Sequence, residues 1–375
     1  MLNLMEDAKL NSWTGGQFTI VRIFLSISGV CFLISNWQAI TQTSFGCRLT
    51  LAFFLFSAFL ALGFKQKFSS FMLVVLYVLL TSTLTSIHLL SFALVINILL
   101  YICTLPEHPL GSLDNRKLEY PDFSWNISDQ QFKKFWRTSW GVWILVLICG
   151  FFIKEQSLNL SQTLDFKGFF SIFSQASGNI LTTLEILLAV YLLIKGPSKI
   201  FYLVFFIVIF TSIFSQEHLV LGSVLPAFLL LFNPAWITPE TSSSTETIFY
   251  DGECGLCQRW IKLVLSEDSI GKAFNFSPIQ SDNFKTIAPG LEVGLDSIVV
   301  AKSDSSLLAK SDAIIYILKK LGGLWVIVSY FLYFIPRFLR NFGYDFVAAI
   351  RHKIFRKPTT ACPIMPPELR ERFML

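Results

Sequence analysis

Hydrophobic residues form long runs over the first two thirds of the chain. A helix needs about 20 apolar residues to cross the hydrocarbon core of a bilayer. On this basis we predict eight membrane spans, at residues 18–37, 47–64, two within 68–105, 138–153, 178–194, 200–214 and 218–232. If the shorter segments are re-entrant, the number of spans is six or seven. The run 68–105 is too long for one span, so we divide it at the polar stretch 81–88. The pattern therefore predicts an all-α membrane bundle.

The pattern changes after residue 236, where a polar linker, 237–246, precedes shorter elements. Strands and helices alternate there, as they do in a small α/β domain. We expect strands at 247–250, 273–277, 297–301 and 306–309, and helices at 255–265 and 312–321, the second with Ser311 as its N-cap. The chain is thus expected to consist of a membrane domain, 1–236, and an α/β domain, 247–375.

A further apolar stretch, 324–355, follows these elements. Pro336 divides it into two helices, and basic residues recur along it, among them Arg337 and Arg351. Apolar residues interspersed with basic ones are typical of amphipathic helices. We expect both helices to pack on the small sheet and to rest on anionic lipid headgroups.

Composition supports the division into a membrane half and an α/β half, and the charges of the loops predict how the chain is oriented in the membrane. Hydrophobic residues make up 53% of the chain and charged residues 15%, against about 25% charged residues in a soluble domain. The predicted loops carry ten lysines and arginines on the side of the N-terminus and three on the other side. Because positive loops stay in the cytoplasm, an even number of spans predicts a cytoplasmic α/β domain on a bacterial inner membrane. The net charge of +5 gives no reason to expect nucleic-acid binding.

A Cys-x-x-Cys motif, Cys254 to Cys257, lies where the first strand of the α/β domain meets its helix. The free N–H groups and the dipole at a helix N-terminus lower the pKa of a thiol placed there. We therefore expect Cys254 to be an exposed attacking thiolate. Cys257, one turn further on and more buried, would resolve the mixed disulfide.

Two residues before Cys254 could assist it, and two other roles for the cysteines have to be considered. Gly252 permits a tight turn out of the strand. Asp251 either tunes Cys254 or accepts a proton, or else it caps the turn through its side chain. Zinc is the main competing interpretation, but it needs four ligands, and His352 and Cys362 are the only further candidates in this half. We expect no metal, and a purely structural role for the two cysteines is the remaining alternative.

Residues 247–375 resemble the DCC family of thiol-disulfide oxidoreductases. The resemblance rests on motifs in order: DGECGLC at 251–257, SDAI at 311–314, IPRFLRNFGYDFVAAIRHKIF at 335–355, and Cys362 followed by ELRERF at 368–373. It implies a thioredoxin-like fold and a redox-active Cys254–Cys257 pair, with Ser311 and Asp312 as supporting residues. Unlike thioredoxins, which have a cis-proline before the corresponding strand, the chain has Asp296-Ser297 there.

The membrane half is similar to the horizontally transferred transmembrane domains related to vitamin K-dependent carboxylases, in its layout and in its ending, 218–236. A quinone would be a cofactor only by that analogy, and no other cofactor is expected. Glu185, His88 and His218 lie within or beside predicted spans, where ionisable residues are costly. Each is a candidate for a proton relay or ligand site, or else a protonated or interfacial residue without a function.

Two functions are compatible with these patterns. The first is a membrane-anchored thiol-disulfide oxidoreductase, with protein or small-molecule disulfides and dithiols as its partners and the lipid bilayer as its support. The alternative is a membrane transport or lipid- or quinone-binding protein whose Cys-x-x-Cys domain is a redox sensor or docking module. Turnover of a disulfide substrate distinguishes the first function from the second.

Overall fold

A computed structural model of the chain describes residues 13–42, 44–81, 89–115, 125–139, 141, 199, 229–240, 245–268, 271, 273–287, 297–355 and 367–374. The chain divides into two compact units. The first, which we call the α/β unit, comprises Met1–Thr19, His108–Asn126 and Asn233–Leu375. The second, the helical unit, comprises Ile20–Glu107 and Ile127–Phe232. Each unit thus combines segments that are distant in sequence.

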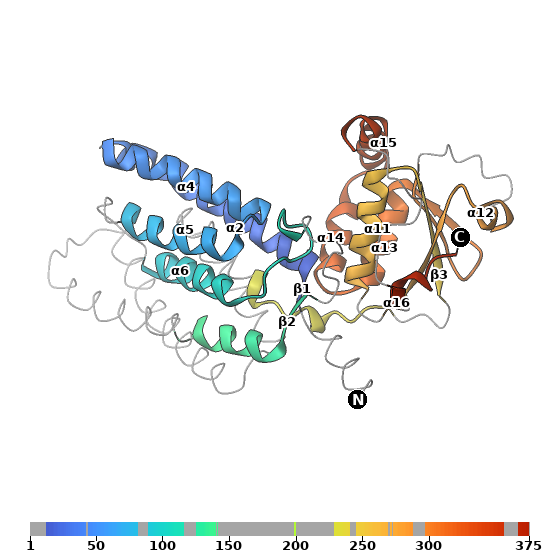
Figure 1. The fold of residues 1–375 in the computed structure, drawn as a ribbon, viewed down its shortest axis with the longest axis horizontal. Coiled ribbons are helices and arrows are strands. Elements are labelled where there is room, and N and C mark those ends of the chain that lie inside the picture. Colours follow the sequence, from blue (N-terminus) through green and yellow to red (C-terminus); the bar gives the residue numbers. More distant parts are fainter. Residues whose placement is uncertain are drawn as a thin grey trace, which may run out of the picture. The chain divides into compact units, whose positions relative to one another are not determined.

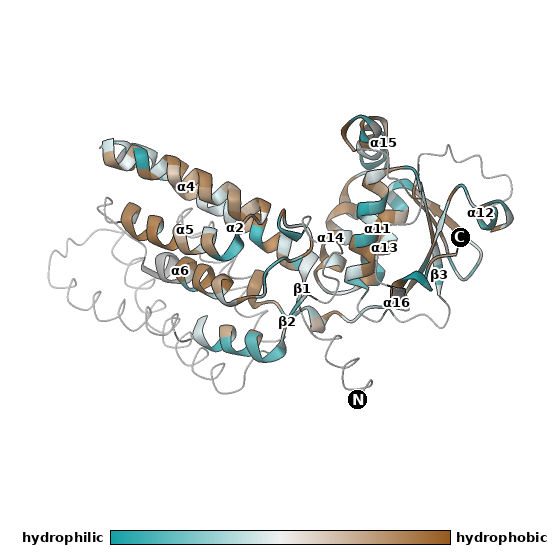
Figure 2. Cartoon of the chain, viewed as in Figure 1, coloured by the Kyte–Doolittle hydropathy of each residue, from teal (hydrophilic) through white to brown (hydrophobic). Residues whose placement is uncertain are grey.

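Apolar helices make up most of the described helical unit, as their brown colour in Figure 2 shows. These helices are α2 (Gly15–Ser35), α3 (Trp37–Thr41), α4 (Ser44–Leu62), α5 (Gln66–Thr81) and α6 (Leu89–Thr104). Of them, α2 and α4 are long and apolar enough to cross a membrane, and they match the first two predicted spans. The shorter helices α5 and α6 lie on either side of the predicted division at 81–88.

The later predicted spans lie largely outside the described residues. A helix at 129–139 overlaps the start of the span predicted at 138–153, and residues 229–231 are helical. Most of 138–153 and 218–232, and nearly all of 178–214, are not described. The described part of the N-terminal region is therefore mostly helical, with two candidate spans. A third candidate lies near the C-terminus, if the bent pair α14–α15 described below is one span. The total of eight stays a prediction.

The α/β unit contains a four-stranded sheet. Its strands are β3 (Glu246–Tyr250), β4 (Phe274–Pro278), β5 (Val299–Ala301) and β6 (Leu307–Ala309), in the order β4-β3-β5-β6. Strands β3 and β4 are parallel and connected through α11 (Gly255–Glu267), whereas β5 is antiparallel to both β3 and β6. The four strands and the helix after the first strand are confirmed, with ends within two residues of those predicted.

Helices cover both faces of this sheet (Figure 1). On one face, Phe249 of β3 and Val299 of β5 share a hydrophobic cluster with Phe284 of α12 (Asp282–Ile287), a short helix that the pattern did not predict. On the other face, α11 and α13 (Lys310–Leu321) lie side by side. The turn between β3 and α11, which carries the two cysteines, therefore leaves the sheet at the edge of this second face.

Two further helices, α14 (Gly323–Phe334) and α15 (Arg337–Ile354), follow α13. They are bent by 109° at the break around Pro336, as the proline predicted. A proline has no N–H to donate and fixes its own φ, so a helix ends before it and a new one starts after it. Helix α15 packs against both α11 and α13 and so lies beside the cysteine turn.

The C-terminal segment extends the sheet. After α16 (Pro367–Arg370), the N–H of Phe276 donates to the carbonyl of Arg372 at 2.8 Å, and the N–H of Met374 donates back to Phe276 at 2.9 Å. The ring of Phe373 stacks on that of Phe276, with centroids 5.2 Å apart. The segment thereby covers the outer edge of β4, which would otherwise present unpaired backbone groups.

The start of α2, which is part of the α/β unit, is bonded to α11. Glu267, the last residue of α11, is buried, and its carboxylate accepts from the hydroxyl of Thr14, the N–H of Gly16 and the indole N–H of Trp325. Because α2 begins at Gly15, this carboxylate satisfies one of the N–H groups that the first helical turn leaves unpaired. The helix that carries the cysteines at one end is therefore bonded, at its other end, to the first turn of α2, which belongs to the same unit.

Candidate redox site

Both cysteines lie at the start of α11. Cys254 is the N-cap residue, and its sulfur accepts a hydrogen bond from the backbone N–H of Cys257 at 3.4 Å. The backbone of Cys254 is extended, with φ −105° and ψ 118°, as an N-cap requires. Both thiols are free, so the structure represents the reduced pair.

The exposure of the pair differs from the prediction. The expectation of an exposed Cys254 is wrong, because only 1% of the residue is exposed, against 4% of Cys257. Of the two cysteines, Cys257 borders the pocket described below. Sequence spacing indicates which cysteine starts the helix, but the packing of distant segments determines which one faces a cavity.

The two thiols have opposite pKa shifts. The pKa of Cys254 is lowered to about 6, mainly because the Cys257 side chain donates a hydrogen bond to it, and also through the Cys257 N–H and the charge of Arg351. These effects outweigh burial, which acts in the opposite direction. The pKa of Cys257 is raised far above its usual range by the same hydrogen bond, by burial and by the negative charge on Cys254. At neutral pH, Cys254 is therefore a thiolate and Cys257 a thiol.

Asp251 organises the turn that precedes Cys254. Its Oδ1 accepts from the N–H of Glu253 and from Nε2 of Gln280, each at 2.9 Å, and its Oδ2 accepts from Arg351 at 2.9 Å. Gln280 in turn accepts from the N–H of Gly252 at 3.2 Å. Of the roles considered for Asp251, its contacts match the turn-capping one, and they add a buried ion pair.

Arg351 is the residue of this site that sequence reasoning missed. It was expected to contact lipid headgroups from α15, but it is 3% exposed and paired with Asp251. The expectation is wrong because the hydrophobic pattern of a helix gives no information about a partner 100 residues away. Asp251 and Arg351 each lie in a stretch that carries the family resemblance, 251–257 and 335–355, but nothing in those stretches indicated that the two residues pair. The guanidinium acts on the pKa of both thiols, so its position matters for their chemistry.

Ser311 does not cap α13, contrary to the prediction. Ala309 is the N-cap residue, the helix begins at Lys310, and Ala309 makes no side-chain capping hydrogen bond. The hydroxyl of Ser311 instead donates to the side-chain oxygen of Asn341 on α15. Ser311 thus connects α13 to the helix that carries Arg351.

Asp312 has a similar connecting role. Its Oδ1 accepts from Arg340 at 2.5 Å, and its Oδ2 pairs with Arg337 at 2.7 Å. Both arginines are on α15, and Arg340 is mostly buried. The SDAI motif therefore holds α15 in place and does not itself touch the cysteines through any bond among the described residues.

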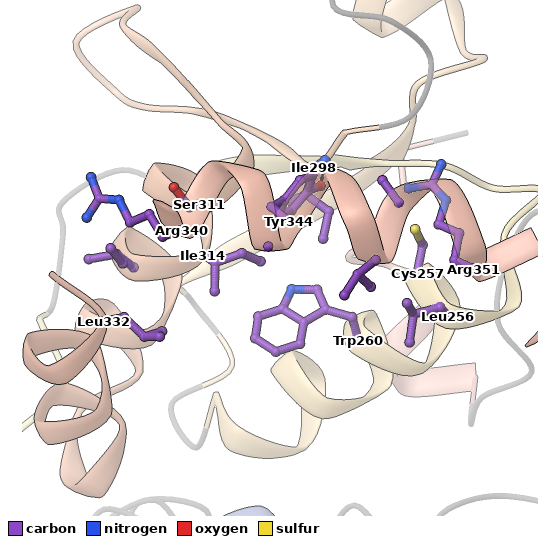
Figure 3. Close-up of a pocket in the computed structure, with 14 residues that line it drawn as sticks. Leu256, Cys257, Trp260, Ile298, Ser311, Ile314, Leu332, Arg340, Tyr344 and Arg351 are labelled. Carbon is purple, nitrogen blue, oxygen red and sulfur yellow. Dashed lines mark hydrogen bonds between the residues drawn. The ribbon is translucent and has the colours of Figure 1, made fainter. Parts of the chain in front are cut away.

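A pocket of about 370 Å³ lies beside Cys257, between α11, α13, α14 and α15 (Figure 3). Its wall includes Leu256, Cys257, Trp260, Ile314, Tyr344 and Ala348. The hydroxyl of Tyr344 accepts from the N–H of Ile298, just before β5, at 2.8 Å. Burial raises the pKa of Tyr344 to about 12, so this hydroxyl stays protonated at neutral pH.

The other candidate residues are not brought to this site. Glu185, His88, His218 and Cys362 lie outside the described residues. Within the described part of the chain, no group of three or more His, Cys, Asp or Glu side chains could hold a metal ion. The described chemistry is thus concentrated around the two cysteines, the Asp251–Arg351 pair and the adjoining pocket.

Comparison with known proteins identifies relatives of this part of the chain. The family profile of DCC1-like thiol-disulfide oxidoreductases matches residues 248–357. A DCC family protein of Arabidopsis thaliana, described as chloroplastic, is 32% identical over 130 residues, which are 32% of this chain and 73% of that protein. The uncharacterized protein YuxK of Bacillus subtilis is 27% identical over 129 residues, or 34% of this chain and 92% of that protein.

These matches leave the N-terminal two thirds of the chain uncovered. No family match supports the resemblance of that half to horizontally transferred transmembrane domains, which stays a prediction. No solved structure matches the chain. The comparisons therefore bear on the α/β unit and on its chemistry.

Proposed function

The chain belongs to the DCC family, and from this premise we propose that it is a membrane-anchored thiol-disulfide oxidoreductase with Cys254 and Cys257 as its redox-active pair. The observation that carries the proposal is the state of Cys254, an N-cap thiol that accepts a hydrogen bond from the Cys257 N–H and has a pKa of about 6. About nine tenths of such a thiol is ionised at pH 7, and the thiolate is the nucleophile in disulfide exchange.

The reaction follows from the opposite pKa shifts. The Cys254 thiolate attacks one sulfur of a substrate disulfide, the substrate S–S bond breaks, and the leaving thiolate takes a proton from solvent. The negative charge on Cys254, a cause of the raised pKa of Cys257, is then gone. Cys257 loses its proton more readily and attacks Cys254, forming the internal disulfide and releasing the second thiol. Two electrons pass from the cysteine pair to the substrate.

A thioredoxin-like fold is part of this proposal. A strand, a helix that begins with Cys-x-x-Cys and a second, parallel strand are the core that such redox proteins share. Strands β3 and β4 with α11 have this order, and β5 and β6 add an antiparallel pair. Because Cys254 is 1% exposed, a protein substrate needs a local opening around the turn 251–254 before its disulfide can meet the thiolate.

Membrane anchoring is the third part. Helices α2 and α4 have the length and composition of membrane spans, and the Glu267 carboxylate bonds to Thr14 and to Gly16 at the start of α2. We propose that the α/β unit sits at the cytoplasmic surface of a bacterial inner membrane, where the positive loops predicted from the sequence would lie. In that reducing compartment the pair would work as a transient, catalytic disulfide.

We expect the full-length protein to show reversible two-electron behaviour in glutathione redox buffers. As the buffer becomes more oxidising, the peptide containing residues 254–257 should lose two hydrogens in one cooperative step, and reducing buffer should reverse it. Mass spectrometry after rapid thiol trapping measures the oxidised fraction. A pair that stays a dithiol in every buffer, or that forms only mixed disulfides with glutathione, would refute the proposal.

A further inference from the structure

We propose that the pocket beside Cys257 binds a quinone dissolved in the membrane, and that this quinone re-oxidises the cysteine pair after a substrate dithiol has reduced it, so that the disulfide exchange described above runs in the reverse direction. The proposal rests on the proposed function, since it names the electron acceptor of the same site. Three observations carry it: the position of Cys257 in the pocket wall, the kind of side chain that surrounds the pocket, and the nature of the helices that form its outer side.

The pocket is apolar and has the size of a small-molecule site. Its volume of about 370 Å³ lies within the range that small-molecule pockets occupy, about 300–1,000 Å³. Leu256, Ile314, Val347 and Ala348 give it hydrophobic walls, and Cys257 brings a sulfur to its edge (Figure 3). The wall also includes Arg340 and Arg351, but their guanidinium groups are already paired with Asp312 and Asp251. A charged disulfide such as oxidised glutathione would therefore bury its own charge without compensation, which is costly.

The pocket wall also contains hydrogen-bond donors without a partner. The indole N–H of Trp260 is buried and has no acceptor among the described residues, and the same is true of Nε of Arg340. In Figure 3 the indole of Trp260 lies within the pocket, with its nitrogen on the side of Tyr344. An unpaired buried donor is costly, and a ligand with carbonyl oxygens would satisfy it. A quinone combines an apolar ring with two such carbonyls.

The helices that form the outer side of the pocket carry an unusual number of exposed aromatic side chains. Phe331 and Phe334 of α14 are 72% and 81% exposed, and Phe338 and Phe342 of α15 are 77% and 71% exposed. The basic residues Arg337 and Lys353 are exposed on α15. Exposed aromatics flanked by basic residues are typical of helices that lie in the surface of an anionic bilayer. A ligand that reaches the pocket past these helices would come from the lipid phase.

Oxidation of the cysteine pair by the quinone balances in electrons and protons. The Cys254 thiolate and the Cys257 thiol lose two electrons as the bond between their sulfurs forms and the S–H bond of Cys257 breaks. The quinone gains these two electrons and two protons, one from Cys257 and one from solvent, and becomes a hydroquinone. A dithiol and a quinone are thus converted to a disulfide and a hydroquinone with no further reactant.

The test uses the full-length protein in vesicles of zwitterionic and anionic phospholipid, with ubiquinone-1 as the probe. The pre-reduced wild type should form one ubiquinol per Cys254–Cys257 pair, followed by the change in quinone absorbance and by thiol trapping. Ala348→Trp fills the pocket and should slow the reaction about tenfold or more. Ala349→Trp is the matched control on the same helix, because Ala349 is exposed and does not line the pocket, and its rate should stay within about twofold of the wild type.

Trp260→Phe provides a second, milder variant. It removes the indole N–H and keeps an aromatic ring. The ubiquinone-1 concentration that gives half the maximal single-turnover rate should therefore rise about three- to tenfold, with little change in the maximal rate itself. Ubiquinol formation that is absent in the wild type, or that is equally fast in Ala348→Trp and Ala349→Trp, would overturn the inference. Disulfide exchange with oxidised glutathione is measured on the same samples. If exchange proceeds while ubiquinone-1 is inert, the quinone inference alone fails, whereas loss of both reactions in the wild type would remove the proposed function as well.

Discussion

Replacing Cys254 with serine will abolish disulfide exchange by the full-length protein, lowering turnover by about a thousandfold or more. Serine has no ionised nucleophile at neutral pH, so no mixed disulfide forms. Cys257→Ser will have a different effect, because Cys254 remains a thiolate and still attacks. The mixed disulfide should then accumulate, since nothing resolves it. Turnover of a disulfide substrate and mass spectrometry of the trapped protein measure the two results.

Cys31→Ser and Cys103→Ser are the controls for this prediction. Both cysteines are free thiols in the helical unit, on α2 and α6, and neither belongs to the redox site. Both variants should turn over like the wild type. Equal turnover of Cys254→Ser and wild type would contradict the assignment of the nucleophile. If the wild type itself shows no turnover, the redox-sensor interpretation becomes the better one.

Arg351→Met is expected to have the second largest effect, on both stability and reactivity. Removing one member of the buried Asp251–Arg351 pair leaves an uncompensated buried carboxylate, which costs about 3–5 kcal/mol of unfolding free energy. The variant also loses the cation that favours the thiolate, so the pKa of Cys254 should rise above about 6. Chemical denaturation and the pH dependence of Cys254 alkylation measure these two changes separately.

Two further variants separate the structural effect from the electrostatic one. Asp251→Asn combined with Arg351→Met removes both charges and should recover much of the stability, while the pKa of Cys254 stays raised because the cation is still absent. Arg337→Met is the control on the same helix. Arg337 is an exposed member of an ion pair with Asp312, so its loss should cost no more than about 1 kcal/mol. Recovery of the wild-type pKa in the double variant would contradict the role assigned to Arg351.

The elements of the α/β unit could be predicted because each is encoded locally. The apolar strand before DGECGLC, the amphipathic helix after it and the break at Pro336 all appear in the structure near their predicted ends. Helix α12 was missed, since its six residues are too few to show a helical period. The cap of α13 was misassigned because a serine before an acidic residue fits an N-cap locally, whereas the hydroxyl of Ser311 is taken by Asn341.

The chemistry of the site was only partly predictable for a related reason. That Cys254 begins a helix follows from the motif, and so does the direction of its pKa shift. Its burial, the ion pair of Asp251 with Arg351 and the pocket beside Cys257 all depend on α15, which lies about a hundred residues downstream. A pattern of apolar and basic residues on α15 could not distinguish an arginine that contacts lipid from one that is buried in a redox site.

The central claim is that Cys254 is ionised near neutral pH, and the rate at which iodoacetamide alkylates it as a function of pH tests this claim most directly. The measurement uses the reduced full-length protein between about pH 4 and pH 10, with Cys254 alkylation quantified by peptide mass spectrometry. Burial slows the absolute rate but leaves the midpoint of the pH profile intact. We predict a rate that rises with pH through a midpoint near 6 and is constant above it. A midpoint at or above about 8.5, the value of an ordinary thiol, would contradict the account.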